Sequence, residues 1–409
     1  MYRFKNTKKL KRLSFTSKSG RVFGGNRAYF SGRNNNKKAF IITAFVTIAA
    51  LVIATVILLP GSQRADSRLT PSPGVTSENQ ATPNFPTLNA DITPRPEVQM
   101  YTNVKEIKIS ERQINVPGVY RHEILFSAGS GSIDKPVLKN LYYYDTITQT
   151  ATKIWESKIR NGEIYETCIS ENWFVWLDTD QYGNNALYKY NRANKEAELI
   201  RECGNNIPKL RLYGDWLVWM EQVDSQTDVL RLVDLSSGEE VILHEFTDPN
   251  YGMSSPCIYK DTVVFAGPHP EYPNVKSLSS IYIIDLNKSV DGELVPEIYT
   301  PGGYVHEPVS NGEAIAWIDT NKSPDARLFI QYGDNQPKFV AKGVSSYSIG
   351  DEYIVYNLNQ VIYAYFYKTD ILARLSEEGQ FCILPVANEN TIVWFDTTDG
   401  DVLKYKILE

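Results

Sequence analysis

The chain has 409 residues, of which 42% are hydrophobic, and its formal net charge is −6. This length suffices for one large domain or two ordinary ones, so a small disulfide-stapled scaffold is excluded. No two of the four cysteines, Cys168, Cys203, Cys257 and Cys382, have the spacing of a zinc site. Their even number permits two disulfides in an exported domain, and buried free thiols fit the same sequence.

Charge is divided unevenly along the chain. Residues 1–38 contain twelve Lys or Arg and no Asp or Glu, whereas the remaining residues contain thirty Lys or Arg and forty-eight Asp or Glu. The two parts are therefore expected to face different surroundings. Basic side chains beside a membrane are attracted to anionic lipid headgroups by ~1 kcal/mol each, which accounts for the basic tail without nucleic-acid binding.

Residues 39–59 form a long segment without any charged side chain. At ~1.5 Å rise per residue, this segment matches the ~30 Å hydrocarbon core of a bilayer, which predicts a transmembrane helix. Because Lys and Arg stay on the cytoplasmic side, the N-terminus is expected inside and the C-terminal domain outside. A cleaved signal peptide is disfavoured, because its apolar region usually has ~7–15 residues and Gln63 disrupts the cleavage pattern. We therefore expect a single-pass plasma-membrane protein with an uncleaved signal anchor.

Residues 60–100 are rich in Pro, Ser and Thr and have almost no apolar periodicity. Such a segment cannot bury enough surface to offset the entropy of ordering it, so an extended or disordered tether is expected. The predicted organisation is thus a basic cytoplasmic tail at 1–38, a transmembrane helix at 39–59, a linker at 60–100 and an extracytoplasmic domain at 101–409.

From residue 101 onward, short strands rich in Val, Ile, Tyr and Trp alternate with turns rich in Gly, Asp and Asn, as in all-β domains. In the unit that recurs, an apolar strand ends in an aromatic residue and a second strand follows. The aromatic positions, 38–52 residues apart, are Phe126, Trp176, Trp219, Phe265, Trp317, Tyr356 and Trp394. With a short outer strand, each unit contains about four antiparallel strands. Four strands in ~40–50 residues indicate one blade of a β-propeller.

The repeat resembles the blade of TolB-like propellers, in which I-V-W-x-D is followed by L-Y-x-Y-D-L-x-x-G. The match is clearest at Trp176–Asp178, Trp317–Asp319, Trp394–Asp396 and Val233–Gly238. The first unit departs from the pattern at Phe126–Ala128, and the fourth departs at Phe265–Gly267. TolB-like propellers commonly have six blades, so six is an alternative to the seven units counted. The resemblance implies an architecture and a bacterial cell envelope, but no activity.

The last unit ends with a strand at Leu403–Leu408 and has no outer strand of its own. Val104–Ile109 alternates apolar and charged side chains and precedes the first unit. We expect this segment to complete the last blade, because joining both ends of the domain in one sheet closes the ring and covers an exposed edge.

No catalytic motif is present in the sequence. The four histidines, His122, His244, His269 and His306, occur singly, and H-E-x-x-H, G-x-S-x-G and a phosphate-binding glycine loop are all missing. We therefore expect no catalytic residue, no metal and no cofactor, while a site assembled from several blades stays open as an alternative.

Several aspartates could be read as ligands or acids, but their positions favour structural roles. Asp178–Gly183 is similar to a calcium loop, yet Tyr182 and Lys189 stand where oxygen ligands are needed, so a hairpin turn is favoured. Asp145, Asp234 and Asp285 recur where the chain turns, which predicts that they cap turns. The recurrent tryptophans are likewise assigned to packing between blades rather than to ligand stacking.

Binding is expected in loops that rigid blades hold around a central channel. Two expected loops are long, Ser127–Asn140 in the first unit and Ala266–Ser280 in the fourth. The second contains the candidate ligand-binding residues His269, Pro270, Tyr272 and Pro273, since stiff side chains suit recognition at low entropic cost.

The leading hypothesis is a membrane-anchored, non-enzymatic binding or scaffold module for a protein or an envelope polysaccharide. The first alternative is a propeller-fold polysaccharide lyase or hydrolase. The second alternative is a transmembrane sensor that acts through oligomerisation or a partner.

Overall fold

The computed structural model describes residues 95–408, apart from residues 112, 133–134, 181, 183, 204–208, 225–226, 247–253, 276, 290–292 and 321–325. Every regular element in these ranges is a β-strand, and none of the described segments is a helix long and apolar enough to cross a membrane. The predicted tail, the predicted transmembrane helix and nearly all of the predicted linker lie outside the described residues.

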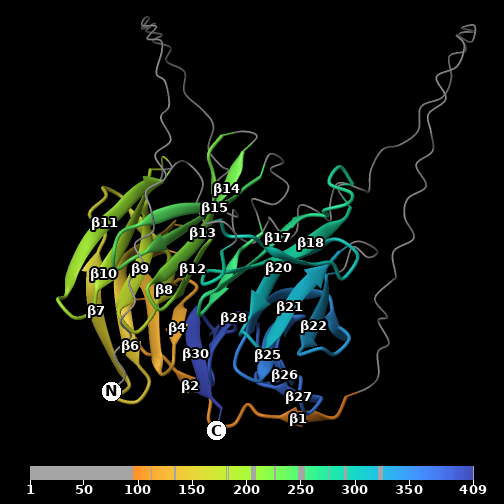
Figure 1. Ribbon diagram of the computed structural model, residues 1–409. Coiled ribbons are helices and arrows are strands. Elements are labelled where there is room, and N and C mark those ends of the chain that lie inside the picture. Colours follow the sequence, from red (N-terminus) through yellow and green to blue (C-terminus); the bar gives the residue numbers. More distant parts are fainter. Residues whose placement is uncertain are drawn as a thin grey trace, which may run out of the picture. The chain divides into compact units, whose positions relative to one another are not determined.

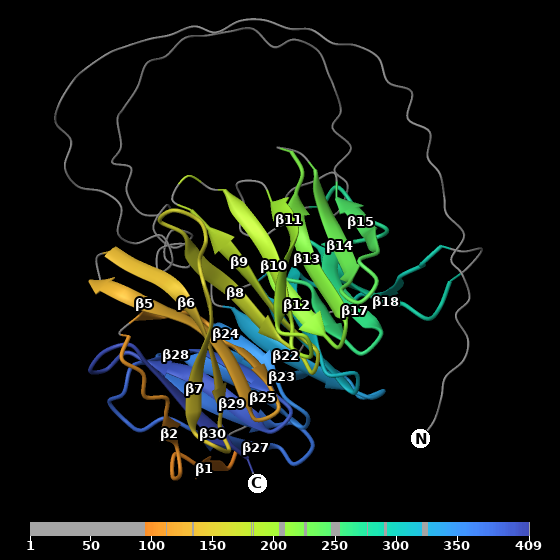
Figure 2. The same cartoon turned by 90° about the vertical axis from the view of Figure 1, so that its left-hand side faces the viewer.

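The strands form seven sheets that follow one another in chain order around a common centre (Figures 1 and 2). Counted outward from the common centre, the first strand of each sheet contacts the first strands of both neighbouring sheets, and this ring runs from β4 (Gly118–Tyr120) to β28 (Cys382–Asn388) and back to β4. The all-β prediction is therefore confirmed, and the architecture is a seven-bladed propeller rather than the six-bladed alternative.

The remaining strand bounds are given by blade. Blade one contains β3 (Gln113–Ile114), β4, β5 (Glu123–Ser132), β6 (Lys135–Asp145) and β7 (Thr150–Glu156). Blade two contains β8 (Glu163–Ile169), β9 (Trp173–Thr179), β10 (Asn185–Asn191) and β11 (Glu196–Cys203), and blade three contains β12 (Leu210–Tyr213), β13 (Trp216–Gln222), β14 (Asp228–Asp234) and β15 (Glu240–Phe246). Blade four contains β16 (Cys257–Tyr259), β17 (Thr262–Pro268), β18 (Ser279–Asp285) and β19 (Glu297–Tyr299).

Blade five contains β20 (Val305–Ser310), β21 (Ala314–Asp319), β22 (Arg327–Tyr332) and β23 (Lys338–Lys342). Blade six contains β24 (Val344–Ile349), β25 (Tyr353–Leu358), β26 (Val361–Phe366), β27 (Ile371–Arg374) and β1 (Glu97–Gln99). Blade seven contains β28, β29 (Thr391–Asp396), β30 (Val402–Ile407) and β2 (Lys105–Glu106).

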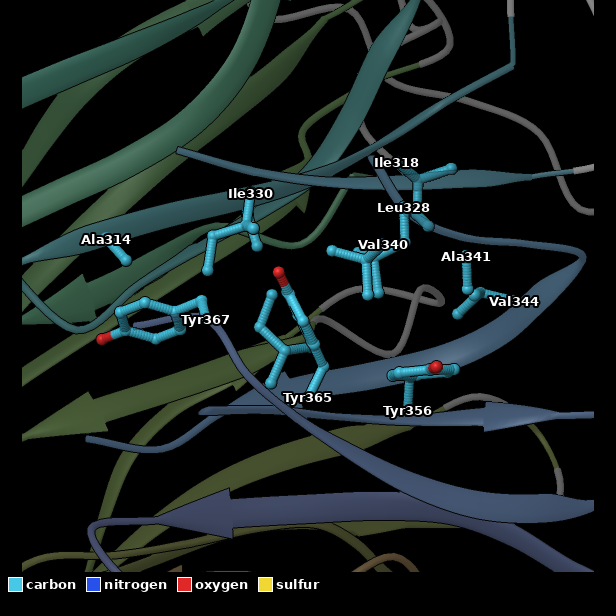
Figure 3. Packing of buried hydrophobic residues seen from close by; sticks show 12 residues of the cluster. Ala314, Ile318, Leu328, Ile330, Val340, Ala341, Val344, Tyr356, Tyr365 and Tyr367 are labelled. Atoms are coloured by element: carbon cyan, nitrogen blue, oxygen red, sulfur yellow. The ribbon is translucent and has the colours of Figure 1, made fainter. Parts of the chain in front are cut away.

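The core consists of apolar layers between neighbouring blades. Each of the seven recurrent aromatic residues lies on the second strand of its blade and is at most 2% exposed. Between blades five and six, Tyr356 and Tyr365 lie opposite Ile330 and Val340 (Figure 3). Because alternate side chains of a strand point to opposite faces, each sheet contributes to the layers on both of its sides. The predicted packing role of the recurrent aromatic residues is confirmed.

Blade seven is completed by a strand from the N-terminal side of the domain. In the antiparallel pair β2–β30, Lys105 lies opposite Tyr405 and Glu106 opposite Lys404 (Figure 1). The Ile107 N–H donates to the Leu403 carbonyl at 2.9 Å, and the Ile107 side chain is only 2% exposed. The predicted closure of the ring by Val104–Ile109 is therefore confirmed.

A second N-terminal strand covers blade six. β1 pairs in parallel with β27, although its residues belong to the stretch expected to be linker. Just before β1, the Arg95 Nη1 donates to the Val340 carbonyl at 2.8 Å and Nη2 donates to the Phe339 carbonyl of blade five. The guanidinium also lies 4.6 Å from the Tyr365 ring centre and pairs with Asp370 at 3.3 Å. Ordered structure thus begins no later than residue 95.

Candidate functional site

The loop predicted to bind a ligand connects the second and third strands of blade four and spans residues 269–278. His269 is 4% exposed, and its Nδ1 accepts a hydrogen bond from the Glu271 N–H at 3.2 Å. The half-buried Tyr272 ring lies 5.1 Å from the His269 ring, while Pro270 and Pro273 are exposed. Burial also lowers the pKa of His269. His269 therefore packs inside the loop, and the two prolines face solvent.

The prediction of a long loop at Ser127–Asn140 in blade one is wrong. β5 extends to Ser132 and β6 begins at Lys135, so nearly all of these residues belong to an extended hairpin. The Gly-Ser sequence that suggested a loop instead allows a bulge between Ala128 and Ser130, because a Cβ on Gly129 would lie 1.6 Å from the Val137 carbonyl oxygen.

The recurrent aspartates cap turns, as predicted. Asp145 Oδ1 accepts hydrogen bonds from the N–H groups of Ile147 and Thr148 at 2.7 and 3.2 Å. Asp234 Oδ1 accepts a hydrogen bond from the Ser236 N–H at 2.8 Å, and Asp285 Oδ1 accepts one from the Asn287 N–H at 3.0 Å. Their carboxylates are thus used to hold the turn between the third and fourth strands.

The segment similar to a calcium loop is a hairpin turn, which confirms the favoured interpretation. Asp180 Oδ1 accepts hydrogen bonds from the N–H groups of Tyr182 and Asn184 at 2.8 and 2.9 Å. Asp178 is fully buried, accepts from the Ser157 hydroxyl at 2.5 Å, and has a pKa raised by burial. The two carboxylates therefore serve separate structural contacts.

Thiols and histidines are placed in packed surroundings. All four cysteines are free, and burial raises the pKa of Cys168 to about 12, which keeps this thiol protonated and unreactive. His244 packs against Phe246 with ring centres 4.5 Å apart, and burial lowers its pKa. Across the described part of the chain, no group of three or more His, Cys, Asp or Glu side chains is arranged to hold a metal ion.

A more distinctive feature is the set of seven two-residue turns that join the first and second strands of the blades. These turns, which we call the rim, surround one end of the ring of first strands. They are residues 121–122, 171–172, 214–215, 260–261, 312–313, 351–352 and 389–390. The first turn residue has a positive φ at Arg121 (52°), Gly214 (58°), Lys260 (52°), Gly312 (83°) and Glu389 (48°), as tight hairpin turns require. In these five blades a positive φ at the same turn position thus presents different side chains.

The rim is strongly acidic. Its carboxylates are Glu171, Asp215, Asp261, Glu313, Asp351, Glu352 and Glu389, whereas its cations are Arg121 and Lys260. Arg121 pairs with Glu389 at 3.3 Å. Burial raises the pKa of Asp351, and the nearby charges of Glu389 and Glu352 raise it further. Lys368, which lies outside the rim turns, pairs with Glu313 at 2.9 Å and with Glu352 at 3.2 Å. Even with this third cation the carboxylates are in excess, and they create a negative potential at this end of the ring of first strands.

Three tyrosines stand immediately before rim turns, at the ends of β4, β12 and β16. The Tyr213 and Tyr259 ring centres are 5.0 Å apart. The Arg121 guanidinium lies over the Tyr120 ring at 5.0 Å, and the Lys260 ammonium lies over the Tyr259 ring at 5.2 Å. Burial raises the pKa of Tyr213, and the phenols of Tyr259 and Tyr120 raise it further.

A cavity of about 560 Å³ opens beside Tyr259, between the rim turns of blades four, five and six. Its lining residues are Tyr259, Lys260, Thr262, Asn311, Gly312, Glu313, Asp351 and Glu352. Asn311 fixes one wall, because its Nδ2 donates to the carbonyls of Gly350 and Asp351 at 2.7 Å each. Gly312 permits close packing, since a Cβ there would lie 2.8 Å from the Tyr259 ring. This volume falls within the ~300–1,000 Å³ range of small-molecule sites.

Sequence reasoning missed the rim, because the first strands are short and less alike than the aromatic second strands. A signal is present, however. The triplets Tyr120–His122, Tyr213–Asp215 and Tyr259–Asp261 each combine a tyrosine with a two-residue turn and occur at corresponding positions of three blades.

No protein-family model matches the sequence, and no curated protein matches it in sequence. Similar folds occur among solved structures. The β-propeller domain of the Trilobed protease from Pyrococcus furiosus is 14% identical, with a TM-score of 0.56 over 73% of this chain and 94% of that one. Oligogalacturonate lyase from Vibrio parahaemolyticus is also 14% identical, with a TM-score of 0.52 over 75% of this chain and 93% of that one.

Other similar structures extend beyond a propeller or match less well. Pyrococcus horikoshii acylaminoacyl peptidase is 12% identical, with a TM-score of 0.51, and the match covers 70% of this chain and 49% of that one. TolB from Acinetobacter baumannii is 10% identical, with a TM-score of 0.40 over 66% of this chain and 60% of that one, a score too low to favour TolB over the others. At these identities, the likeness shows the propeller fold alone.

Proposed function

We propose that the protein is a non-catalytic binding module, held at the outer face of the membrane, that takes a partner at the acidic, tyrosine-lined rim of its propeller. The observation that supports this function is the combination of seven carboxylates, two cations and three tyrosines in the rim region, where Tyr259 lines a cavity of about 560 Å³. Residues that recur in all blades are used in packing, whereas rim residues differ between blades and are mostly in contact with solvent.

The chemistry of the rim favours a positively charged protein segment as the partner. Carboxylates attract Lys and Arg over roughly a Debye length of ~8–10 Å, and complementary charge accelerates association. Tyrosine faces add ~0.5–1 kcal/mol for each cation at an exposed site. An acidic envelope polysaccharide would be repelled by the same carboxylates. Of the two partner classes expected from the sequence, a protein with a basic segment is the one that gains from this charge.

The membrane arrangement is proposed from the sequence. Residues 39–59 anchor the protein, the basic tail at 1–38 lies inside against anionic lipid headgroups, and the propeller lies outside. Protease added to intact cells should remove the propeller and leave an epitope tag at the N-terminus intact. Digestion of that tag from outside the cell would contradict the orientation.

The binding proposal is tested by screening the full-length protein against a peptide library and an envelope-glycan array. We expect peptide hits enriched in Lys and Arg, which are lost when Asp351 and Glu389 are replaced together by Asn and Gln. The comparison variant is Tyr272→Ala, which alters the loop in blade four and leaves the rim intact. Hits that survive the rim replacements but disappear with Tyr272→Ala would overturn the proposal.

A further inference from the structure

The rim turns of blades one, three and four repeat one local structure but differ in their turn residues. In each of them a tyrosine ends the first strand and a two-residue turn follows. The first turn residues, Arg121, Gly214 and Lys260, have φ values of 52°, 58° and 52°, so the turns match at this residue. In blades one and four this residue is a cation that lies over the ring of the preceding tyrosine. In blade three it is a glycine.

The Tyr213 face therefore lacks the cation that its two counterparts have. Among the described residues, no Lys or Arg lies over the Tyr213 ring as Arg121 lies over Tyr120 and Lys260 over Tyr259. A Cβ built on Gly214 would meet no heavy atom within 4 Å, so the space beside this turn is open.

The next residue of the turn, Asp215, carries a negative charge that is held towards blade two. The Asp215 carboxylate accepts hydrogen bonds from the Trp173 indole N–H at 2.7 Å and from the Asn172 amide at 3.1 Å. Both donors are neutral, and Asp215 has no ion pair with any described residue, so its charge is oriented but not neutralised. An aromatic face and an oriented carboxylate are the two groups that bind an organic cation best at a protein surface.

Building on the proposed function of the rim, we propose that the Tyr213 face beside Gly214 is a subsite for the ammonium or guanidinium group of a Lys or Arg side chain from a protein partner. The partner's cation occupies the position that Arg121 and Lys260 occupy in the other two turns. A Lys or Arg side chain, whose charged group lies at the end of a flexible aliphatic chain, fits this geometry. Arg121 and Lys260 reach the corresponding positions over Tyr120 and Tyr259 in the same way. The amine of an aminosugar has no such flexible chain.

The test uses the full-length protein and a fluorescein-labelled tetralysine peptide, with binding followed by fluorescence anisotropy. Gly214→Lys should fill the subsite from within the chain, as Lys260 does at Tyr259, and weaken tetralysine binding about fivefold. Gly214→Asn is the matched backbone control, because Asn tolerates a positive φ and adds no charge. Asn390→Lys is the matched charge control, because it adds one cation to another rim turn.

The subsite is supported if Gly214→Lys weakens binding clearly more than Asn390→Lys does, while Gly214→Asn binds like the wild type. It is overturned if the two lysine variants lose the same affinity, in which case the general attraction of the rim for cations stands without a subsite. The subsite is also overturned if the wild type does not bind tetralysine. In that case the peptide and glycan screen still tests, independently, whether the rim is the binding surface. A glucosamine tetramer that binds as tightly as tetralysine and responds equally to Gly214→Lys would overturn the assignment to a protein side chain.

Discussion

The second strands and the rim turns of the seven blades follow opposite rules. At the aromatic position of the second strand all blades carry Phe, Trp or Tyr, and all seven rings are buried. At the first rim position the blades carry, in chain order, Arg, Glu, Gly, Lys, Gly, Asp and Glu. Agreement between repeats thus marks the packing that every blade needs. Disagreement marks a surface that packing does not constrain, and there a partner can select the side chains.

The largest expected effect lies on the packing side of this comparison. Trp317 is fully buried and stacks on Phe329 with ring centres 6.1 Å apart. Trp317→Ala should therefore lower the free energy of unfolding by about 3–5 kcal/mol, measured by chemical denaturation. Tyr182→Ala is the control, because Tyr182 is 77% exposed and its loss should change stability by less than ~0.5 kcal/mol. Similar values for the two variants would contradict the packing role.

A somewhat smaller effect is expected where the ring closes. Ile107→Ala should lower the free energy of unfolding by about 2–4 kcal/mol, because this side chain is 2% exposed between blades one and seven. Ile147→Ala is the control, and it should change the free energy of unfolding little, because Ile147 is 69% exposed. Deleting 104–109 should uncover the edge of β30 and lower the melting temperature further. An unchanged melting temperature after the deletion would reject closure by this strand.

The loop in blade four should contain one buried residue that stabilises the fold and, close to it, a more exposed residue that stabilises it less. His269→Ala should destabilise the fold by about 1 kcal/mol, because His269 is buried, while Tyr272→Ala should cost less. Because both residues lie outside the repeat pattern, the sequence predicts that neither change affects stability, whereas the burial of His269 predicts a loss for His269→Ala. Thermal denaturation of the two variants side by side checks the order, and a larger loss for Tyr272→Ala would contradict the placement of these side chains.

The smallest expected effect depends on pH. Burial lowers the pKa of His244 below its ordinary value of 6.5, so the unfolded chain binds a proton more readily than the folded chain. The stability contributed by neutral His244 is therefore complete above about pH 6.5 and is lost as the pH falls towards the lowered pKa. His244→Phe, which keeps an aromatic ring beside Phe246 and Phe265, should flatten the pH dependence of unfolding between pH 7 and 5.5. An identical slope in both proteins would contradict the prediction.

The sequence predicted most of the fold and little of the site, for a physical reason. The aromatic strands, the turn-capping aspartates and the closing strand are repeated or alternating patterns, and local periodicity reports such features directly. The rim tyrosines come from blades one, three and four, and Tyr213 and Tyr259 meet only when two blades pack against each other. The burial of His269 likewise could not be read from the sequence, since it depends on how a proline-rich loop folds. Contacts between distant segments leave no local pattern in a single sequence.

The rim as the binding surface is tested most directly by removing equal charge from two places. One variant carries Glu313→Gln, Asp351→Asn and Glu389→Gln on the rim, and its control carries Glu196→Gln, Glu198→Gln and Glu202→Gln on the exposed outer strand of blade two. Tetralysine affinity, measured for both full-length variants at the same ionic strength, should fall about tenfold in the rim variant and stay near the wild-type value in the control. Equal losses in the two variants would show that overall charge, not the rim, attracts the peptide, and would contradict the proposed function.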